Sequence, residues 1–183
     1  IMGIGFFSAF SIAAAIYFMV HNILAKTAAF LAGGLVYEKT GSYQLKKIGG
    51  LFKTSPWIGL LFFIPALSLA GLPPLSGFFG KLFLIIGGLK LEYYVITGIA
   101  VWVGIVTLFS MLKIWLEAFW KPKPEGAQEI SKIPLKTTMV LPVALFALAT
   151  LAFGLTAGWF MEVFNEAAEA MRNPEMYINA VLK

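Results

Sequence analysis

The sequence predicts an all-α fold, a polytopic bundle of transmembrane helices in which one helix is discontinuous. Hydrophobic residues make up 60% of the 183-residue chain and charged residues 13%, and the mean hydropathy is +0.86. Soluble domains carry about 25% charged residues, so this chain has too little polar surface to fold in water. Long apolar segments recur along it, and one contains two adjacent prolines near its middle. We therefore expect a single transmembrane domain, residues 1–183, in a lipid bilayer.

Composition also excludes several classes of function. The net charge of +5 comes from fourteen lysines and arginines against nine acidic residues. These charges lie between apolar segments, so they indicate membrane topology rather than binding to nucleic acid. The chain has no cysteine and a single histidine, which argues against a disulfide framework, a thiolate nucleophile or a zinc site. It also lacks a glycine-rich phosphate loop and a Ser/His/Asp set, so we expect no cofactor, no metal and no hydrolytic chemistry.

The chain begins with a short stub, residues 1–9, which precedes the first predicted span at about 9–36. A span needs about 20 apolar residues, because a helix rises 1.5 Å per residue across roughly 30 Å of hydrocarbon. The apolar sequence starts at Ile1 without a charged region, so it does not resemble a signal peptide. We expect the chain to be the carboxy-terminal piece of a longer membrane protein.

The second apolar segment, residues 56–89, is too long for one ideal helix and short for two. A straight helix of this length would measure about 50 Å. Pro73 and Pro74 lie in its middle, and two prolines remove two backbone donors, so a helix must break there. The break is either a tight turn between two short spans or an interruption within one discontinuous span.

The positions of the lysines decide between these two topologies, because lysine and arginine concentrate in short cytoplasmic loops. Two loops are basic: residues 37–55 hold Lys39, Lys46, Lys47 and Lys53, and residues 121–134 hold Lys121, Lys123 and Lys132, with Lys136 just beyond. If both loops are cytoplasmic, an even number of crossings separates them. The third predicted span, at about 93–119, is one crossing. The segment 56–89 must then be the other, a single span broken at Pro73-Pro74.

The remaining segments complete the predicted topology. A fourth span is expected at about 135–163, and the tail, 164–183, belongs with the weakly basic turn near 87–91 on the outer side. Lys113 and Glu117 are spaced i, i+4 near the cytoplasmic end of the third span. The favoured interpretation of this spacing is an interfacial ion pair, not a functional site.

A broken helix in a bilayer is costly unless protein covers it or it lines a water-filled cavity, because the freed N–H and C=O groups find no partner in lipid. Transporters use such breaks at their ion sites, where the ends of the half-helices present partial charges. The discontinuous span therefore points towards the movement of ions or protons.

Two lysines lie inside the predicted spans. Lys26 is near the middle of the first span, where an ammonium group costs about 2.5–3.5 kcal/mol on insertion scales. Lys81 follows the double proline by about two turns, deep in the membrane, and is the best single candidate for a proton-carrying group. Burial disfavours the charged form of a lysine, which lets the side chain accept and release protons near neutral pH. The alternative for each is a structural lysine that balances charge elsewhere in the protein.

His21 is five residues before Lys26, which places the two side chains about 140° apart around a helix. They therefore need not face the same partner. A lone histidine is often a hydrogen-bonded packing residue. Next to a lysine in a membrane span, however, a group that titrates near pH 6.5 fits a proton relay.

Three stretches, residues 21–31 (HNILAKTAAFL), 48–51 (IGGL) and 67–81 (LSLAGLPPLSGFFGK), resemble the proton-translocating antiporter family. This family comprises the large subunits of Mrp-type multisubunit sodium/proton antiporters, the antiporter-like subunits of respiratory complex I, and related subunits of membrane-bound hydrogenases. The ending, residues 173–182, is most similar to the Mrp branch. The resemblance covers essentially the whole chain in order, and the LPPLSGFFGK stretch is highly specific.

The resemblance implies the carboxy-terminal part of a 14-helix antiporter-like subunit, from the end of the tenth helix through the fourteenth. In this family the discontinuous twelfth helix carries a key lysine or glutamate, which corresponds to Lys81. The eleventh helix carries a histidine and a lysine, which correspond to His21 and Lys26. The spacing here is His-x4-Lys, whereas some complex I subunits have His-x3-Lys. A further glutamate and lysine, in the fifth and seventh helices, lie outside this sequence.

The function implied is that of a membrane subunit of a monovalent cation (sodium)/proton antiporter, a secondary transporter that moves protons through buried lysines. Lys26 and His21 would pass charge towards Lys81, and coupling to sodium would be electrostatic, through the other subunits of the complex. One alternative is a proton-pumping subunit of a respiratory NADH:quinone oxidoreductase or membrane-bound hydrogenase. Another is a purely structural membrane subunit. The expected location is the plasma membrane of a prokaryote, crossed several times.

Overall fold

The computed structural model describes residues 2–125, 130–131, 133–173, 175, 178 and 181. No strand occurs among these residues, and the predicted all-α class with a discontinuous helix is confirmed. Ile1, Lys132 of the second basic loop and most of the predicted tail beyond residue 173 lie outside the described part. The elements are α1 Met2–Gly5, α2 Ala9–Thr40, the 3-10 helix η1 Leu45–Lys47, α3 Leu51–Thr54, α4 Pro56–Ala70, α5 Ser76–Lys90, α6 Tyr94–Trp115, the π-helix η2 Leu116–Trp120, α7 Thr137–Leu155 and α8 Ala157–Arg172.

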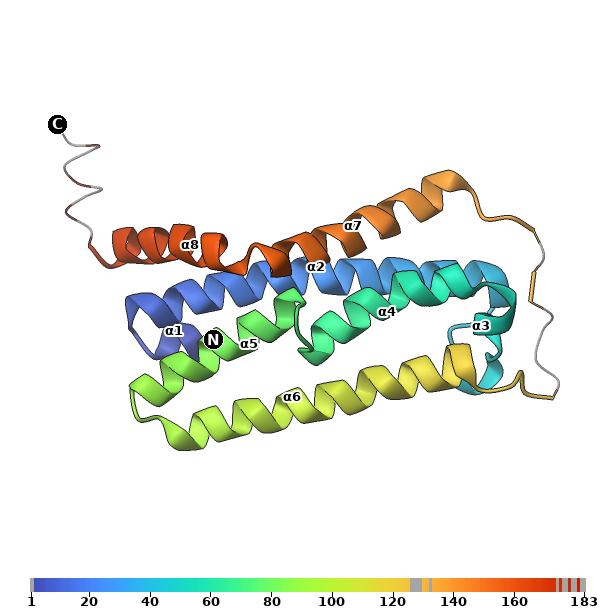
Figure 1. The fold of residues 1–183 in the computed structure, drawn as a ribbon, viewed down its shortest axis with the longest axis horizontal. Coiled ribbons are helices and arrows are strands. Elements are labelled where there is room, and N and C mark those ends of the chain that lie inside the picture. Colours follow the sequence, from blue (N-terminus) through green and yellow to red (C-terminus); the bar gives the residue numbers. More distant parts are fainter. Residues whose placement is uncertain are drawn as a thin grey trace.

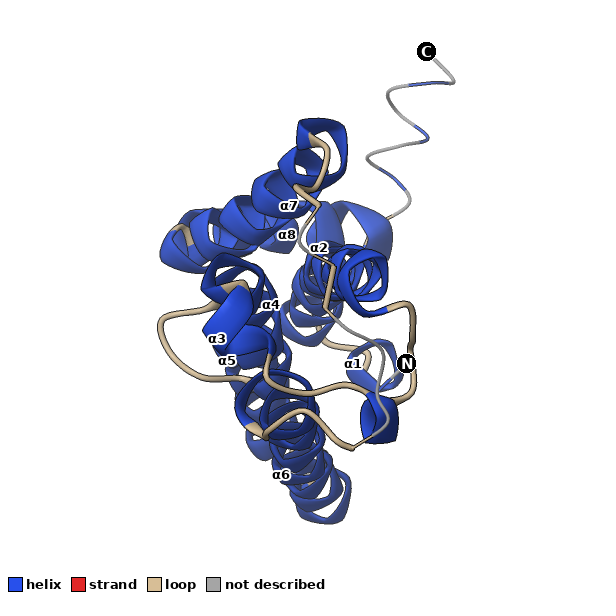
Figure 2. Ribbon diagram, turned by 90° about the vertical axis from the view of Figure 1, so that its right-hand side faces the viewer, coloured by secondary structure: helices blue, strands red, loops and turns tan. Residues whose placement is uncertain are grey.

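The long helices lie side by side along the long axis of the molecule (Figure 1). Helix α6 forms one edge, α7 and α8 form the opposite edge, and α2, α4 and α5 lie between them, as the end-on view also shows (Figure 2). The two basic loops are at one end of the bundle, and the turn between α5 and α6 is at the other (Figure 1). Helices α4 and α5 follow one another end to end, so this segment runs along the bundle once.

Within the described residues, three helical stretches are long and apolar enough to cross a membrane: Ala9–Lys47, Tyr94–Trp120 and Thr137–Leu155. Helices α4 and α5 contain 15 residues each. Each is about 22 Å long at 1.5 Å per residue, which is less than the roughly 30 Å of a hydrocarbon core. Neither half can cross alone, and the two together can.

Local sequence explains where the discontinuous helix stops. Gly71 adopts a left-handed conformation, with φ 88°, and its N–H donates to the carbonyls of Leu67 and Ser68. Glycine reaches this conformation without the steric cost that a Cβ imposes, which makes it a common helix terminator. Pro73 and Pro74 then lack the backbone donors that would continue the helix. Helix α5 starts afresh two residues later.

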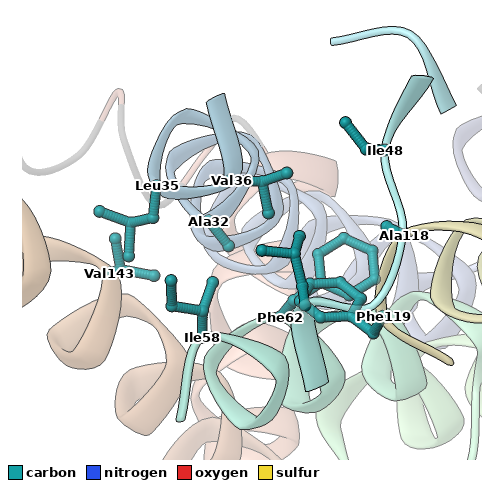
Figure 3. Close-up of a cluster of buried hydrophobic side chains, with 11 residues drawn as sticks. Ala32, Leu35, Val36, Ile48, Ile58, Phe62, Ala118, Phe119 and Val143 are labelled. Atoms are coloured by element: carbon teal, nitrogen blue, oxygen red, sulfur yellow. The ribbon is translucent and has the colours of Figure 1, made fainter. Parts of the chain in front are cut away.

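One buried cluster joins the ends of α2, α4, η2 and α7 beside the basic loops (Figure 3). Its members are Ala32, Leu35, Val36, Ile48, Leu51, Ile58, Phe62, Ala66, Ala118, Phe119 and Val143. Packing of this kind, rather than escape from water, holds helices together where the surroundings are already apolar. The cluster therefore anchors the end of the bundle that carries most of the loop charge.

The Gly49-Gly50 pair lies beside this cluster and brings the two basic loops into contact. The N–H of Gly50, which has φ 70°, donates to the carbonyl of Lys121 at 2.7 Å. A Cβ on Gly49 would lie 2.7 Å from the carbonyl oxygen of Pro122, so only glycine allows this approach. The pair has a packing role between loops.

The fourth predicted span, 135–163, differs from the structure, in which α7 ends at Leu155 and α8 continues to Arg172. The interruption coincides with a close approach between α7 and the linker between α4 and α5. A Cβ on Gly154 would lie 2.7 Å from the carbonyl oxygen of Pro74. The end of α7 is therefore shaped by the helix break that it covers.

Helix α8 extends beyond the predicted boundary because its apolar face packs on α2. Met161 and Ala168 are buried there, against Ala13 and Ala14. Three exposed glutamates, Glu162, Glu166 and Glu169, lie on the other face. They lower the average hydropathy, so hydropathy alone does not show how far the helix continues.

The predicted pair between Lys113 and Glu117 is wrong. Glu117 instead bonds Lys121, with 3.0 Å between Oε2 and Nζ. The chain widens into the π-helix η2 at this point, and the N–H of Lys121 donates to the carbonyl of Leu116. Lys121 follows Glu117 by four residues, a spacing at which two side chains on one helix can meet. Both side chains are partly exposed, and such pairs contribute about 0–1 kcal/mol.

Candidate functional site at the helix break

Lys81 lies in the second turn of α5 and reaches back across the break to the end of α4. Its Nζ donates hydrogen bonds of 2.9 Å to the carbonyl oxygens of both Leu69 and Ala70. The last carbonyls of a helix have no partner within it and carry partial negative charge, so an ammonium group is stabilised there. The aliphatic part of Lys81 passes Gly71, where a Cβ would lie 2.9 Å from Cδ. Lys81 thus caps α4 from α5.

His21 reaches the same break from α2. It is 1% exposed, and its Nδ1 lies 2.9 Å from the Oγ of Ser76, the first residue of α5. Ser76 Oγ is in turn 3.1 Å from Ser68 Oγ on α4. Ser68 Oγ also accepts a hydrogen bond of 3.3 Å from the N–H of Gly77. A chain of polar groups therefore joins three helices across the break.

Both serines are fully buried, with 0% exposure. Neither serine is among the site residues that the sequence predicts, because serine is common in membrane helices and carries no charge. The sequence feature that could have identified them is their position on either side of the double proline. A polar side chain beside a helix break has freed backbone groups within reach.

Gly77 makes the close packing at this point possible. A Cβ there would overlap the carbonyl oxygen of Ser68 and would lie 2.8 Å from Cε1 of His21. Any side chain would therefore push the start of α5 away from both α4 and α2. The glycine in the SGFFGK sequence allows the polar chain to form.

Lys26 is placed differently from the other two candidates. It is exposed on α2, whereas His21 is buried against Ser76. All three candidates nevertheless line one cavity of about 960 Å³ between α2, the α4–α5 break and α6. Asn22 adds a further polar group, and most of the remaining lining is apolar. The structure therefore brings the predicted site residues Lys26, Lys81 and His21 to one place.

The titratable side chains that line this cavity can exchange protons. Its lining, in the described part of the chain, contains two lysines and a histidine but no carboxylate. Within the same described residues, no group of three or more His, Cys, Asp or Glu side chains is placed to hold a metal ion. Hard cations prefer oxygen ligands with negative charge, whereas a lysine can bind and release a proton.

The fold and the site define a class: a polytopic membrane bundle in which a lysine caps the first half of a discontinuous helix, beside a cavity that a second lysine and a histidine also line. Transporters place ion sites at breaks of this kind. The family model described as NADH:quinone oxidoreductase/Mrp antiporter, TM, matches residues 1–109, and the chain belongs to this family.

A curated relative agrees with this membership. The chain is 40% identical, over 183 residues, to a Na(+)/H(+) antiporter subunit from Alkalihalophilus pseudofirmus, covering 100% of this chain and 37% of the relative. The chain thus spans little more than a third of that relative's length.

Solved structures show the same architecture. The chain superposes on the Mrp complex from Dietzia sp. DQ12-45-1b with a TM-score of 0.87 and 30% identity, covering 99% of this chain and 41% of the matched chain. It superposes on respiratory complex I from Thermus thermophilus with a TM-score of 0.77 and 25% identity, covering 92% and 35%.

Proposed function

We propose that the whole protein is a subunit of an Mrp-type multisubunit sodium/proton antiporter, and that this part of it moves protons through Lys81, Lys26 and His21. In this proposal the protein is a secondary transporter subunit and not an enzyme. Its partners are the other subunits of the complex, and it resides in the plasma membrane of a prokaryote. Both the 40% identity to a sodium/proton antiporter subunit and the TM-score of 0.87 with an Mrp complex support this assignment.

The observation that carries the proposal is the position of Lys81 at the break. Its ammonium donates to the carbonyls of Leu69 and Ala70, and hydrogen bonds from a charged donor are roughly twice as strong as neutral ones. Loss of the proton weakens both bonds at once. The protonation of Lys81 is thereby linked to the contact that holds the two half-helices together.

The cavity provides a route to this lysine. Lys26 and His21 lie along its wall on α2, and water in this space of about 960 Å³ would find its hydrogen-bond partners at these side chains, at Asn22 and at Lys81. Protons would pass through water and these side chains to Lys81. Two positive side chains and no carboxylate in the described lining make this cavity unfavourable for a cation, so coupling to sodium would be electrostatic and would act from elsewhere in the complex.

The alternative function, a proton-pumping subunit of a redox-driven complex, has weaker support. The similarity to complex I is lower in both sequence and shape than the similarity to the Mrp complex. Both functions would use the same lysine at the break. The two functions therefore belong to two branches of one family, the Mrp antiporters and the redox-driven complexes, and the proposal assigns the chain to the Mrp branch.

The test is Lys81→Ala in the full-length subunit, assembled in its complex and assayed in inverted membrane vesicles for a sodium-dependent change in the proton gradient. We expect the exchange to be abolished. Lys46→Ala, which removes an exposed loop lysine, is the matched control and should exchange normally. Exchange at the unaltered rate in an assembled Lys81→Ala complex would refute the proposal.

A further inference from the structure

Two buried serines, Ser68 and Ser76, form a chain of hydrogen bonds that ends at Nδ1 of His21. The proposed proton relay gives these serines no role. We propose that Ser76, oriented by Ser68, is a positioning residue that keeps Nδ1 of His21 as a hydrogen-bond acceptor, so that neutral His21 carries its proton on Nε2. This inference rests on the proposed function, because His21 acts on protons only if the cavity conducts them. It adds Ser68 and Ser76 to the proposed pathway, and both serines act only through His21.

The N–H of Gly77 determines the direction of the hydrogen bonds between the two serines and His21. The N–H of Gly77 can only donate, so it fixes Ser68 Oγ as an acceptor. If Nδ1 of His21 and the hydroxyl of Ser68 both donated to Ser76, the hydrogen of Ser76 would have no acceptor within this chain of groups. With Nδ1 as a donor, the hydroxyl of Ser76 would therefore have to donate to Ser68. The oxygen of Ser68 would then receive two hydrogens, and its own hydrogen would have no acceptor within this chain of groups. A buried donor without a partner is energetically unfavourable.

The opposite direction satisfies every group. Ser68 donates to Ser76 over 3.1 Å, and Ser76 donates to Nδ1 of His21 over 2.9 Å. Each hydroxyl hydrogen then has an acceptor, and Ser68 still accepts from Gly77. A neutral imidazole whose Nδ1 accepts a hydrogen bond carries its hydrogen on Nε2. The geometry therefore selects one tautomer.

The helix break sets this direction. The N–H of Gly77 belongs to the first turn of α5, where amide groups have no partner within the helix. Gly77 also packs so closely on Ser68 and His21 that no side chain fits. The positions of α4 and α5 relative to each other therefore determine which hydrogen bond the ring of His21 accepts.

In the part of the chain that the structure describes, two charged side chains share the cavity with His21. Lys26 lies on the same helix, and Lys81 faces the cavity from α5. The described cavity-lining residues of α4 and α6 include no titratable side chain, and Tyr17 of α2 is bonded to α7 through the carbonyl of Phe153. A second proton on His21 would have to enter at Nδ1, which requires Ser76 to turn its hydroxyl away. Ser76 thus decides when His21 accepts a proton.

The decisive experiment is a double-mutant cycle on sodium/proton exchange by the full complex in vesicles. Ser76→Ala should slow exchange about two- to tenfold, the range expected for one lost hydrogen bond. In a His21→Ala background the same change should have no further effect, because Ser76 acts through His21. Ser11→Ala is the matched control, since Ser11 is also fully buried on α2 but bonds Ser8, and it should leave the rate unchanged.

The second measurement reads the tautomer directly. The complex is labelled with 15N-histidine, and subtracting the spectrum of the His21→Ala complex isolates the nitrogens of His21. We expect an unprotonated Nδ1 in the unaltered protein and a substantial protonated fraction at Nδ1 in Ser76→Ala. Ser68→Ala provides a second route if Ser76→Ala does not assemble, and it should shift the tautomer in the same sense.

The possible outcomes separate the two proposals. A protonated Nδ1 in the unaltered protein, or equal slowing by Ser76→Ala with and without His21, would overturn the positioning role. If His21→Ala reduces exchange below detection, the tautomer measurement decides. Normal exchange by Lys81→Ala would instead refute the proposed function, and the tautomer spectrum would still test the role of Ser76.

Discussion

The ammonium of Lys81 donates a hydrogen bond of 2.9 Å to the carbonyl oxygen of Ala70, the last residue of α4. In lipid, each carbonyl freed by a helix break lacks a partner and costs free energy. A hydrogen bond to a charged group contributes about 1.5–3 kcal/mol. The lysine that is expected to carry the proton is therefore also the group that stabilises the interruption in the helix.

Replacing Lys81 by arginine should separate its two roles, which are proton transfer and stabilisation of the helix break. Lys81→Arg keeps a permanent positive charge with several donors, so the contact to the end of α4 can be retained. A guanidinium group does not release its proton, so exchange should be lost although the complex assembles. Lys81→Met should lose both the exchange and part of the stability.

The measurements are the yield of assembled complex by size-exclusion chromatography and exchange in vesicles. Normal exchange by an assembled Lys81→Arg complex would show that Lys81 works by its charge and not by proton release.

Lys26 is expected to affect transport without affecting stability. Its side chain is exposed on the cavity side of α2, unlike Lys81, whose ammonium bonds two carbonyls. Lys26→Ala should therefore lower the exchange rate but leave the melting temperature of the complex unchanged. A drop in melting temperature with unchanged specific activity would instead assign Lys26 a structural role. Both quantities can be measured on the same purified complex.

Gly77 should tolerate no substitution. Gly77→Ala inserts a Cβ against the carbonyl of Ser68 and the ring of His21. Because backbone atoms cannot move aside as a side chain can, the cost should reach or exceed the usual 1–3 kcal/mol of overpacking. We expect a lower melting temperature and little exchange.

Gly34→Ala in α2 is the control for this change. A Cβ there meets no atom within 4 Å. Alanine is the better helix former by about 1 kcal/mol, so stability should be unchanged or slightly raised. Equal melting temperatures for the two variants would contradict the close packing at Gly77.

Lys39 should stabilise the end of the bundle that carries the basic loops. It is 8% exposed and donates to the carbonyls of Ser131 and Ile133 over 3.0 and 2.7 Å. Lys39→Ala leaves these acceptors without their charged donor and should destabilise the protein by about 1.5–3 kcal/mol. The second basic loop should also be cleaved faster in limited proteolysis.

Lys46→Ala serves as the comparison, because Lys46 is exposed in the other basic loop. It should change neither the melting temperature nor the cleavage rate. Identical protection of the loop in the two variants would show that the bonds made by Lys39 do not hold it.

Much of the site could be predicted because it depends on local features of the chain. Two adjacent prolines end any helix, so the break at Pro73-Pro74 follows from covalent structure. A lysine within an apolar segment has no inexpensive position in lipid, which singled out Lys26 and Lys81. These inferences needed only hydropathy and the geometry of one helix.

Other parts depended on distant segments. Ser68 and Ser76 become partners because the break places the start of α5 against the end of α4. His21, which precedes Ser76 by 55 residues in the chain, contacts Ser76 from α2. Lys39 and Lys46 look alike in a basic loop, yet Lys39 is buried by a segment 92 residues further on. The extent of α8 likewise depended on packing against α2, which hydropathy does not report.

The sequence by itself determined that the chain belongs in a membrane, where its discontinuous helix breaks, and which lysines lie within the apolar segments, because these properties arise within single segments. Only the tertiary structure decided that Lys81 caps α4 and that two serines orient His21. Hydrogen bonds act over about 3 Å, so their partners are known only once the helices are packed.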